Sequence, residues 1–220
     1  PRLALVGDEI ADGQWDQTPG HSLPLAMFDA VRVDYSLKRL QHYTGTHWRD
    51  VQPWILLTNY HRYVDQFIAW GIKQLSQEGP YESLHIPGGG IILRGMEKPA
   101  IDAIIKASIW HRFQMPAYHL KRKDGMGGGV TLVNIGVGPS NAKNMTDHLA
   151  VMRPHCWLMI GHCGGLRQSQ RIGDYVLAHG YLREDKILDA VVPPAIPIPA
   201  LAEVQCALQG AAADVTGESG

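Results

Sequence analysis

The sequence predicts an α/β fold, and two features of residues 130–160 carry that prediction. Residues 130–137 are almost wholly apolar and β-branched, which is typical of a strand covered on both faces. A glycine loop, an amphipathic helical stretch and a second apolar strand at residues 156–160 follow in that order. Strand, loop, helix and strand in this sequence define a parallel βαβ unit with the usual right-handed crossover.

The residues before this unit predict shorter elements of both kinds. Val33, Leu37 and Leu40 recur at helical spacing, with Asp34 and Ser36 near the expected cap. In chain order we expect a strand at residues 3–6, a loop at 13–24, a helix at 31–43, a strand at 53–58, a helix at 63–70 that ends at Gly71 or soon after, and a strand at 83–87.

The second half continues the alternation of helices and strands. Pro99 stands where a first-turn proline belongs, and an isoleucine stripe follows it to Ile109. The glycine-rich residues 124–129 join two strands as a hairpin. We expect strands at residues 118–121, 130–137 and 174–178, helices at 99–109, 142–152 and 200–208, and a proline-rich loop at 191–199.

The composition excludes several classes of partner. Lys and Arg number 20 against 21 Asp and Glu, so the chain lacks the basic surface expected of a nucleic-acid-binding protein. Its apolar runs are far shorter than the ~20 residues that span a bilayer, so we expect no membrane partner. Three cysteines without CxxC spacing predict reduced thiols in a cytoplasmic protein, and we expect no metal site.

Three glycine-rich loops, at residues 88–90, 136–138 and 161–165, follow predicted strands. Ligands of open α/β sheets bind outside the carboxyl ends of the strands, and a missing Cβ lets backbone N–H groups approach an anion or a sugar hydroxyl. After Gly138 the helix N-terminus adds unpaired N–H groups. The alternative interpretation is a set of tight turns in which Ser140 or Asn141 is an ordinary N-cap.

Other motifs give weaker signals. Gly136-x-Gly138-x-x-Asn141 lacks the third glycine and the acidic partner of a dinucleotide site, and the P-loop ending is absent. His162 is poorly placed to activate Cys163, because adjacent residues at a strand end point in opposite directions. We therefore expect Cys163 to be a small packed residue, while His162 stays open between a ligand-facing role and a structural one. Residues 60–63 could stack on a base and bind phosphate, or could be the polar start of a helix.

Several of these segments closely resemble the bacterial AMP nucleosidase family, within the purine nucleoside phosphorylase superfamily. The most specific are Gly-Val-Gly-Pro-Ser-Asn at residues 136–141 and Gly-His-Cys-Gly-Gly at residues 161–165. The resemblance runs from about Val6 to Leu208 and also includes residues 34–37, 42–46, 58–65, 146–151 and 172–179.

The resemblance implies a nucleoside-phosphorylase-like fold, with three αβα layers and a mixed, largely parallel central sheet. Residues 1–50 would be the end of an N-terminal regulatory domain and its connector, and residues 51–220 the first part of the catalytic domain. It also implies hydrolysis of the N-glycosidic bond of AMP to adenine and ribose 5-phosphate, without a cofactor for the chemistry. The family forms homohexamers, is activated by MgATP and is inhibited by phosphate.

Individual residues take roles only through this resemblance. Gly88 and Gly89 match a loop on the phosphate side, and Gly138 and Ser140 match the loop beside the ribose. Asn59, Tyr60 and Arg62 match a segment that reaches a neighbouring subunit's site. The loop between phosphate and base is matched by Gly161, His162, Cys163 and Gly164. Phosphorylases carry serine in place of His162, and that change fits the loss of phosphate as the nucleophile.

The sequence departs from the family pattern at its end. The family's catalytic Asp and the Met-Glu pair that holds the ribose hydroxyls would follow Gly220, and Asp174 matches a structural position instead. We therefore expect an interior fragment that contains no catalytic residue and has no turnover alone. Two alternatives remain: a purine nucleoside phosphorylase that uses phosphate as co-substrate, and a non-catalytic nucleotide-binding or assembly module.

Overall fold

The computed structural model describes residues 7–12, 28–124, 127–184, 186–187 and 189–217. The chain divides into two compact units, Pro1–Gly161 and His162–Gly220, which are treated separately below. The strand predicted at residues 3–6 and the loop predicted at 13–24 lie outside the described residues.

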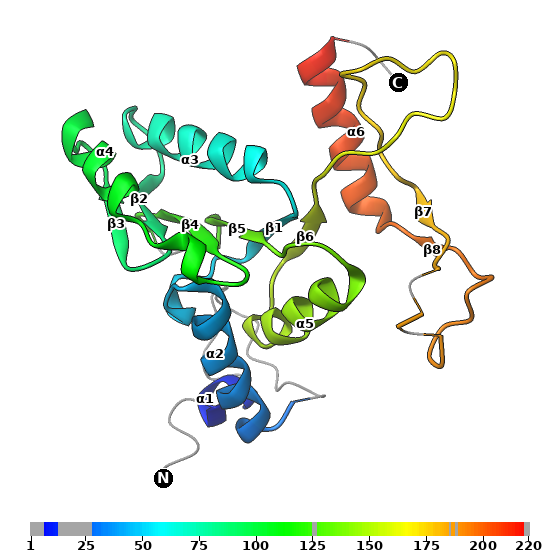
Figure 1. Ribbon diagram of the computed structural model, residues 1–220, viewed down its shortest axis with the longest axis horizontal. Helices are drawn as coiled ribbons and strands as arrows, with labels where there is room; N and C mark the ends of the chain where they lie inside the picture. Colours follow the sequence, from blue (N-terminus) through cyan, green and yellow to red (C-terminus); the bar gives the residue numbers. More distant parts are fainter. Residues whose placement is uncertain (1–6, 13–27, 125–126, 185, 188, 218–220) are drawn as a thin grey trace. The chain divides into compact units, whose positions relative to one another are not determined.

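A six-stranded sheet forms the centre of the first unit (Figure 1). Its strand order is β3-β2-β4-β5-β1-β6. The strands are β1 (Trp54–Thr58), β2 (Tyr81–Ile86), β3 (Gly90–Leu93), β4 (Ala117–Arg122), β5 (Val130–Asn134) and β6 (Cys156–Met159). Every strand of this sheet was predicted except β3, and β5 is shorter than expected.

The sheet is mixed, as predicted, but parallel pairing is confined to one half of it. Strand β1 pairs in parallel with both β5 and β6, with Trp54 opposite Val130 on one side and Cys156 on the other. The pairs β2–β3, β2–β4 and β4–β5 are antiparallel. The expectation of a largely parallel sheet is therefore corrected, since two of its pairings are parallel and three antiparallel. The βαβ unit is confirmed, with β1 lying between its two strands.

One face of the sheet is covered by α1 (Gly7–Ala11), α2 (Ala30–Thr44) and α5 (Pro139–Leu149). These helices bury an apolar cluster against the sheet that includes Leu40, Ile55 and Val133. Helix α2 begins at Asp29, whose carboxylate accepts a hydrogen bond from the Arg32 N–H at 2.7 Å. The cap was expected near Asp34 and Ser36, but both residues are buried inside the helix because they lie on its sheet-facing side with Val33 and Leu37.

The opposite face is covered by α3 (His61–Leu75) and α4 (Lys98–Ala107). Successive strand residues point to opposite faces, so Leu132 joins this second cluster while Val133 joins the first. Figure 1 shows α3 and α2 on opposite sides of the sheet. Helix α3 continues past Gly71, since this glycine lies inside the helix with Leu84 of β2 only 3.2 Å from where its Cβ would stand.

The second unit contains β7 (Gly180–Tyr181), β8 (Ile198–Pro199) and α6 (Ala202–Thr216). The strand predicted at residues 174–178 does not form, because these residues have no pairing partner among those described. Strands β7 and β8 pair with each other, which places two residues of the predicted proline-rich loop in a strand. Helix α6 is longer than the helix predicted at residues 200–208. In the described part of the chain, no helix has both the length and the apolar character needed to cross a bilayer.

Candidate functional site

Four strands of the first unit run in the same direction and end at one edge of the sheet. Strands β2, β5, β1 and β6 share this direction, as the pairings require. The loops that follow them are residues 87–89, 135–138, 59–60 and 160–161, and we call them together the carboxyl edge. The predicted convergence of glycine loops at one edge is confirmed for the part that lies in this unit.

Direct contacts hold three of these loops together. The Ile135 N–H donates to the Thr58 carbonyl at 2.8 Å, and the Ile160 N–H donates to the Leu57 carbonyl at 2.8 Å. The Tyr63 hydroxyl donates to the Gly161 carbonyl at 3.3 Å. The loops after β5, β1 and β6 are therefore fixed relative to one another.

Gly161 is also the point where the loop after β6 meets the loop after β1. A Cβ at Gly161 would lie 3.7 Å from Asn59 Oδ1 and 3.7 Å from a ring carbon of Tyr60. Asn59 Oδ1 is buried, and no hydrogen bond reaches it within the described residues. A buried acceptor of this kind costs about 1–3 kcal/mol when it is left unpaired. The edge therefore contains an acceptor that suits a ligand donor.

The start of α5 provides donors at the same edge. Its N-cap is Gly138, at φ 106° and ψ 151°, and no side chain caps the helix. The alternative in which Ser140 or Asn141 is an ordinary N-cap is therefore wrong: Asn141 Nδ2 instead donates to the Val137 carbonyl at 3.2 Å. A helix N-terminus without a side-chain cap leaves first-turn N–H groups for an anion or a hydroxyl oxygen.

The two glycines after β2 differ in what they can offer. The Gly88 N–H donates to the Gly45 carbonyl at 2.9 Å, and a Cβ there would lie 2.6 Å from the Ile109 side chain. Gly89, at φ +89°, has nothing within 4 Å of the corresponding position. Gly88 thus anchors the loop through an internal hydrogen bond, whereas Gly89 faces open space.

A buried polar network fixes the segment that leads to Gly45 and β1. His119 lies between Thr46 Oγ1, at 2.7 Å from Nε2, and Thr131 Oγ1, at 2.9 Å from Nδ1. Burial lowers the pKa of His119 to about 3, so the imidazole is neutral. Sequence reasoning missed this network, although His119 and Thr131 occupy the strand positions that alternate with Tyr118 and Leu132.

An ion pair lies next to this network. Asp50 Oδ1 is 3.1 Å from His85 Nδ1 and 3.1 Å from Lys121 Nζ. Burial opposes ionisation of Asp50, but the hydrogen bonds and charges of His85 and Lys121 outweigh it and hold the Asp50 pKa well below its ordinary value. Together these contacts attach residues 44–52 to the sheet.

The remaining predicted site residues fall in two places. Arg62 is exposed in the first turn of α3, next to Tyr60. His162, Cys163 and Gly164 belong to the second unit, where all three are exposed. The expectation that Cys163 is a packed residue is wrong, because no buried side chain of this unit surrounds it. No group of three or more His, Cys, Asp or Glu side chains arranged to hold a metal ion occurs among the described residues.

Comparison with known proteins gives consistent matches. The family model described as the phosphorylase superfamily matches residues 95–220. AMP nucleosidases of Escherichia coli K12 and O157:H7 are each 57% identical over 219 residues, which is 99% of this chain. The chain spans 44% of the length of these relatives.

Solved structures match the fold at low identity. A crystal structure of AMP nucleosidase from Bacteroides thetaiotaomicron aligns with a TM-score of 0.59 and 22% identity, over 84% of this chain and 64% of that one. A uridine phosphorylase from Vibrio fischeri gives a TM-score of 0.54 and 12% identity, over 84% of this chain and 61% of that one. A purine nucleoside phosphorylase from Toxoplasma gondii gives a TM-score of 0.53 and 14% identity, over 79% of this chain and 58% of that one.

Proposed function

The chain belongs to the phosphorylase superfamily, and from this premise we propose that it is part of an enzyme that hydrolyses the N-glycosidic bond of AMP to adenine and ribose 5-phosphate. Identity of 57% to two AMP nucleosidases supports the choice of reaction within the superfamily. The observation that carries the proposal is the carboxyl edge, where N–H donors of α5 and an unpaired carboxamide oxygen of Asn59 belong to loops joined by hydrogen bonds.

The edge has the chemistry that a sugar phosphate needs. Backbone N–H groups at Gly89 and in the first turn of α5 suit phosphate and ribose oxygens, with Gly138 and Ser140 beside the ribose. Asn59 Oδ1 can accept from a ribose hydroxyl. In this proposal the chain's residues bind the nucleotide and orient it, which lowers the barrier through positioning.

The reaction also needs an acid that protonates the leaving base while a ribosyl cation develops. We propose that this group, an Asp in the family, lies outside this sequence. A positioned acid contributes about 10²–10⁴-fold in rate, so the chain alone should bind AMP without measurable turnover.

Asn59 Oδ1 and a ring carbon of Tyr60 would lie 3.7 Å from a Cβ placed at Gly161 of their own chain. We therefore propose that they line the site of this chain, beside the role at a neighbouring subunit's site that the resemblance implies for Asn59, Tyr60 and Arg62. The proposal keeps His162, Cys163 and Gly164 between phosphate and base, and keeps Arg62 near the site. It also includes a cytoplasmic homohexamer that is activated by MgATP, is inhibited by phosphate and needs no cofactor for the chemistry.

A binding and product assay tests this function. Calorimetry of the chain with AMP should show saturable binding, and chromatography after long incubation should show no adenine. Asn59→Ala should weaken AMP binding about 5–10-fold through loss of one hydrogen bond, whereas Asn144→Ala, beyond the first turn of α5, should leave it unchanged.

The possible failures of this assay are distinct. Absence of AMP binding would overturn the proposed function. Release of adenine by the chain would place the acid within residues 1–220, contrary to the proposal. Release of adenine only when phosphate is added, with a ribose 1-phosphate ester as the second product, would instead support the phosphorylase alternative.

A further inference from the structure

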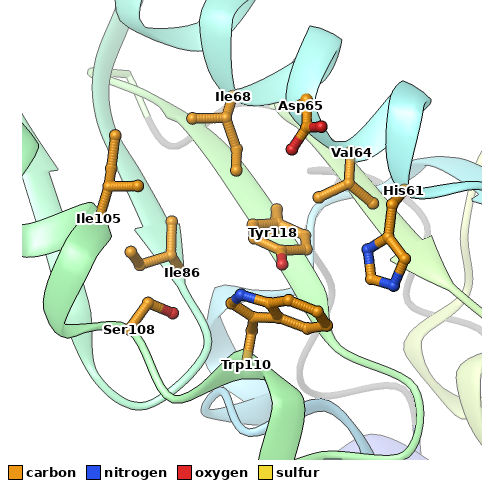
Figure 2. Close-up of a pocket in the computed structure, with 9 residues that line it drawn as sticks. All are labelled: His61, Val64, Asp65, Ile68, Ile86, Ile105, Ser108, Trp110 and Tyr118. Atoms are coloured by element: carbon orange, nitrogen blue, oxygen red, sulfur yellow. The ribbon is translucent and has the colours of Figure 1, made fainter.

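A pocket lies between α3 and α4, on the face of the sheet that carries the second apolar cluster. It is a pocket of about 110 Å³, and Figure 2 shows its lining. Its aliphatic wall comes from Val64, Ile68, Ile86 and Ile105. None of the residues assigned to the carboxyl edge lines it, so it does not depend on the proposed function.

Tyr118 forms the base of this pocket and brings a hydroxyl group to its lining. Tyr118 of β4 is 2% exposed, and within the described residues no hydrogen bond reaches its hydroxyl group. Burial raises the pKa of Tyr118, and the nearby Asp65 carboxylate raises it further, so the group keeps its proton. Because the residue lines the pocket and its hydroxyl has no hydrogen bond within the described residues, the hydroxyl is a donor available to a ligand.

The acidic group of the pocket, Asp65, can only accept hydrogen bonds when it is ionised. Asp65, on α3, is exposed, and no hydrogen bond or ion pair reaches its carboxylate in the part of the chain that is described. Ser108 already donates its hydroxyl proton to the Pro87 carbonyl at 3.0 Å. Besides the ring nitrogens of His61 and Trp110, the pocket thus offers the Tyr118 hydroxyl as a donor and the Asp65 carboxylate as an acceptor.

Aromatic rings complete the lining. Trp110, in the 3₁₀ turn η2 (Trp110–Arg112), is 38% exposed, and its ring centroid is 4.6 Å from that of His61. In Figure 2 the Tyr118 hydroxyl points toward the Trp110 indole, and Asp65 lies on the opposite side of the Tyr118 ring. Flat rings at a pocket wall favour a flat ligand, because stacked aromatic pairs are worth about 0.5–1.5 kcal/mol beyond the area that they bury.

We propose that this pocket binds an amino-substituted nitrogen heterocycle, whose exocyclic amino group donates to Asp65 and whose ring nitrogen accepts from Tyr118. The pocket is smaller than the apolar cavity of about 150 Å³ that holds benzene, so it limits a ligand to a single ring. An anion is disfavoured by the Asp65 carboxylate, and a hydrocarbon would leave the Tyr118 hydroxyl unpaired. Trp110 supplies the plane on which the ring stacks.

Titration of the ¹⁵N-labelled chain with 4-aminopyrimidine, followed by NMR, tests this proposal. We expect saturable shifts with a Kd on the order of 1 mM, at the Trp110 indole N–H and at amides of α3 and α4. Pyrimidine, which lacks the amino group, should bind at least about tenfold more weakly, because it cannot donate to the carboxylate.

Two pairs of variants make the assignment specific. Tyr118→Phe keeps the buried ring and should weaken binding about fivefold, whereas Tyr175→Phe, at an exposed position of the second unit, should not change it. Asp65→Asn should weaken binding by a similar factor, and Asp102→Asn, at an exposed position of α4, should have no effect.

Three results would overturn the proposal. These are equal affinity for pyrimidine and 4-aminopyrimidine, shifts confined to residues away from α3 and α4, and unchanged affinity in Tyr118→Phe. If Tyr118→Phe does not fold, the exposed Asp65→Asn variant decides the question alone, and unchanged binding there rejects the assignment.

Discussion

The first unit buries two apolar clusters on opposite faces of its sheet, whereas no described residue of the second unit is buried. Both units contain the patterned apolar segments of an α/β protein, and the family match at residues 95–220 covers parts of both. In the first unit these segments face helices across a sheet. In the second, Leu166 and Ile172 remain almost fully exposed. An apolar sequence pattern forms a buried core only where another layer of helices or strands packs against it.

This contrast predicts a large difference between matched core and surface truncations. Leu132, in the centre of β5, has no exposed surface, while Leu166 is 97% exposed. Leu132→Ala should lower the free energy of unfolding by about 2–5 kcal/mol, because it removes buried methyl groups and leaves a cavity. Leu166→Ala should change it by less than about 0.5 kcal/mol.

Urea unfolding monitored by circular dichroism measures both variants. Equal destabilisation by the two substitutions would show that Leu166 is packed in solution and would remove the contrast between the units.

The buried imidazole of the first unit predicts a pH dependence that the exposed histidines of the second should lack. His119 has a pKa lowered to about 3 in the folded chain against 6.5 ordinarily, so below pH 6.5 the unfolded chain takes up a proton that the folded chain refuses. The neutral His119 therefore makes its full contribution to the free energy of unfolding above about pH 6.5, and this contribution falls as the pH drops. Between about pH 7 and about pH 4.5 the loss should be on the order of 2–3 kcal/mol.

Unfolding free energies across this pH range, compared between the parent chain and two variants, check the prediction. His119→Gln should flatten the slope, and His179→Gln, in the second unit, should leave it as it is. A slope that persists in His119→Gln would assign the pH dependence to other groups.

Replacing each of two glycines by alanine should change the stability of the chain in opposite directions. Gly138, at φ 106° and ψ 151°, has a backbone conformation that is almost restricted to glycine, so Gly138→Ala should destabilise the chain by about 1–3 kcal/mol. Gly210 lies inside α6 with open space around it, and Gly210→Ala should stabilise that helix by about 0.5–1 kcal/mol.

Thermal unfolding of both variants shows whether each substitution lowers or raises the stability. A neutral Gly138→Ala would mean that the α5 entry relaxes to another conformation, and the proposed donors would then lose their fixed direction.

Cysteine labelling provides the smallest but most direct comparison. Cys163 and Cys206, both in the second unit, are exposed, while Cys156 of β6 is partly buried and burial raises the pKa of its thiol. We expect two thiols to react with a disulfide reagent at least about tenfold faster than the third. Proteolysis of the partly labelled chain, followed by mass spectrometry, identifies the reacted thiols. Fast reaction at Cys156 would contradict its partial burial.

Much of the first unit could be predicted from its sequence, because local patterns and tertiary packing agree there. The hairpin of β4 and β5, helix α3 and the first-turn proline of α4 are cases in which residue spacing and turn-forming residues indicate the same structure. The edge that collects the glycine loops followed from strand direction alone.

Other features required information that a local pattern does not contain. Strand β3 follows two glycines, begins with a third and pairs with β2 alone among the described residues, so its formation depends on that partner. Residues 174–178 have a strand-like composition but no described partner. The Tyr118 pocket combines residues from α3, α4 and three other segments that lie far apart in the sequence. Gly88 was predicted as a ligand-binding amide, and its hydrogen bond to Gly45 could be recognised only in three dimensions.

The position of β1 between β5 and β6 has a consequence for biosynthesis. A nascent chain leaving the ribosome can close the β2–β3 and β4–β5 hairpins from neighbouring residues, but β1 must wait for partners that emerge much later. Until Cys156–Met159 is translated, one side of β1 has no neighbour, and its apolar residues are exposed to chaperones or to another unfinished chain. The parallel half of the sheet, made of β5, β1 and β6, is thus completed last.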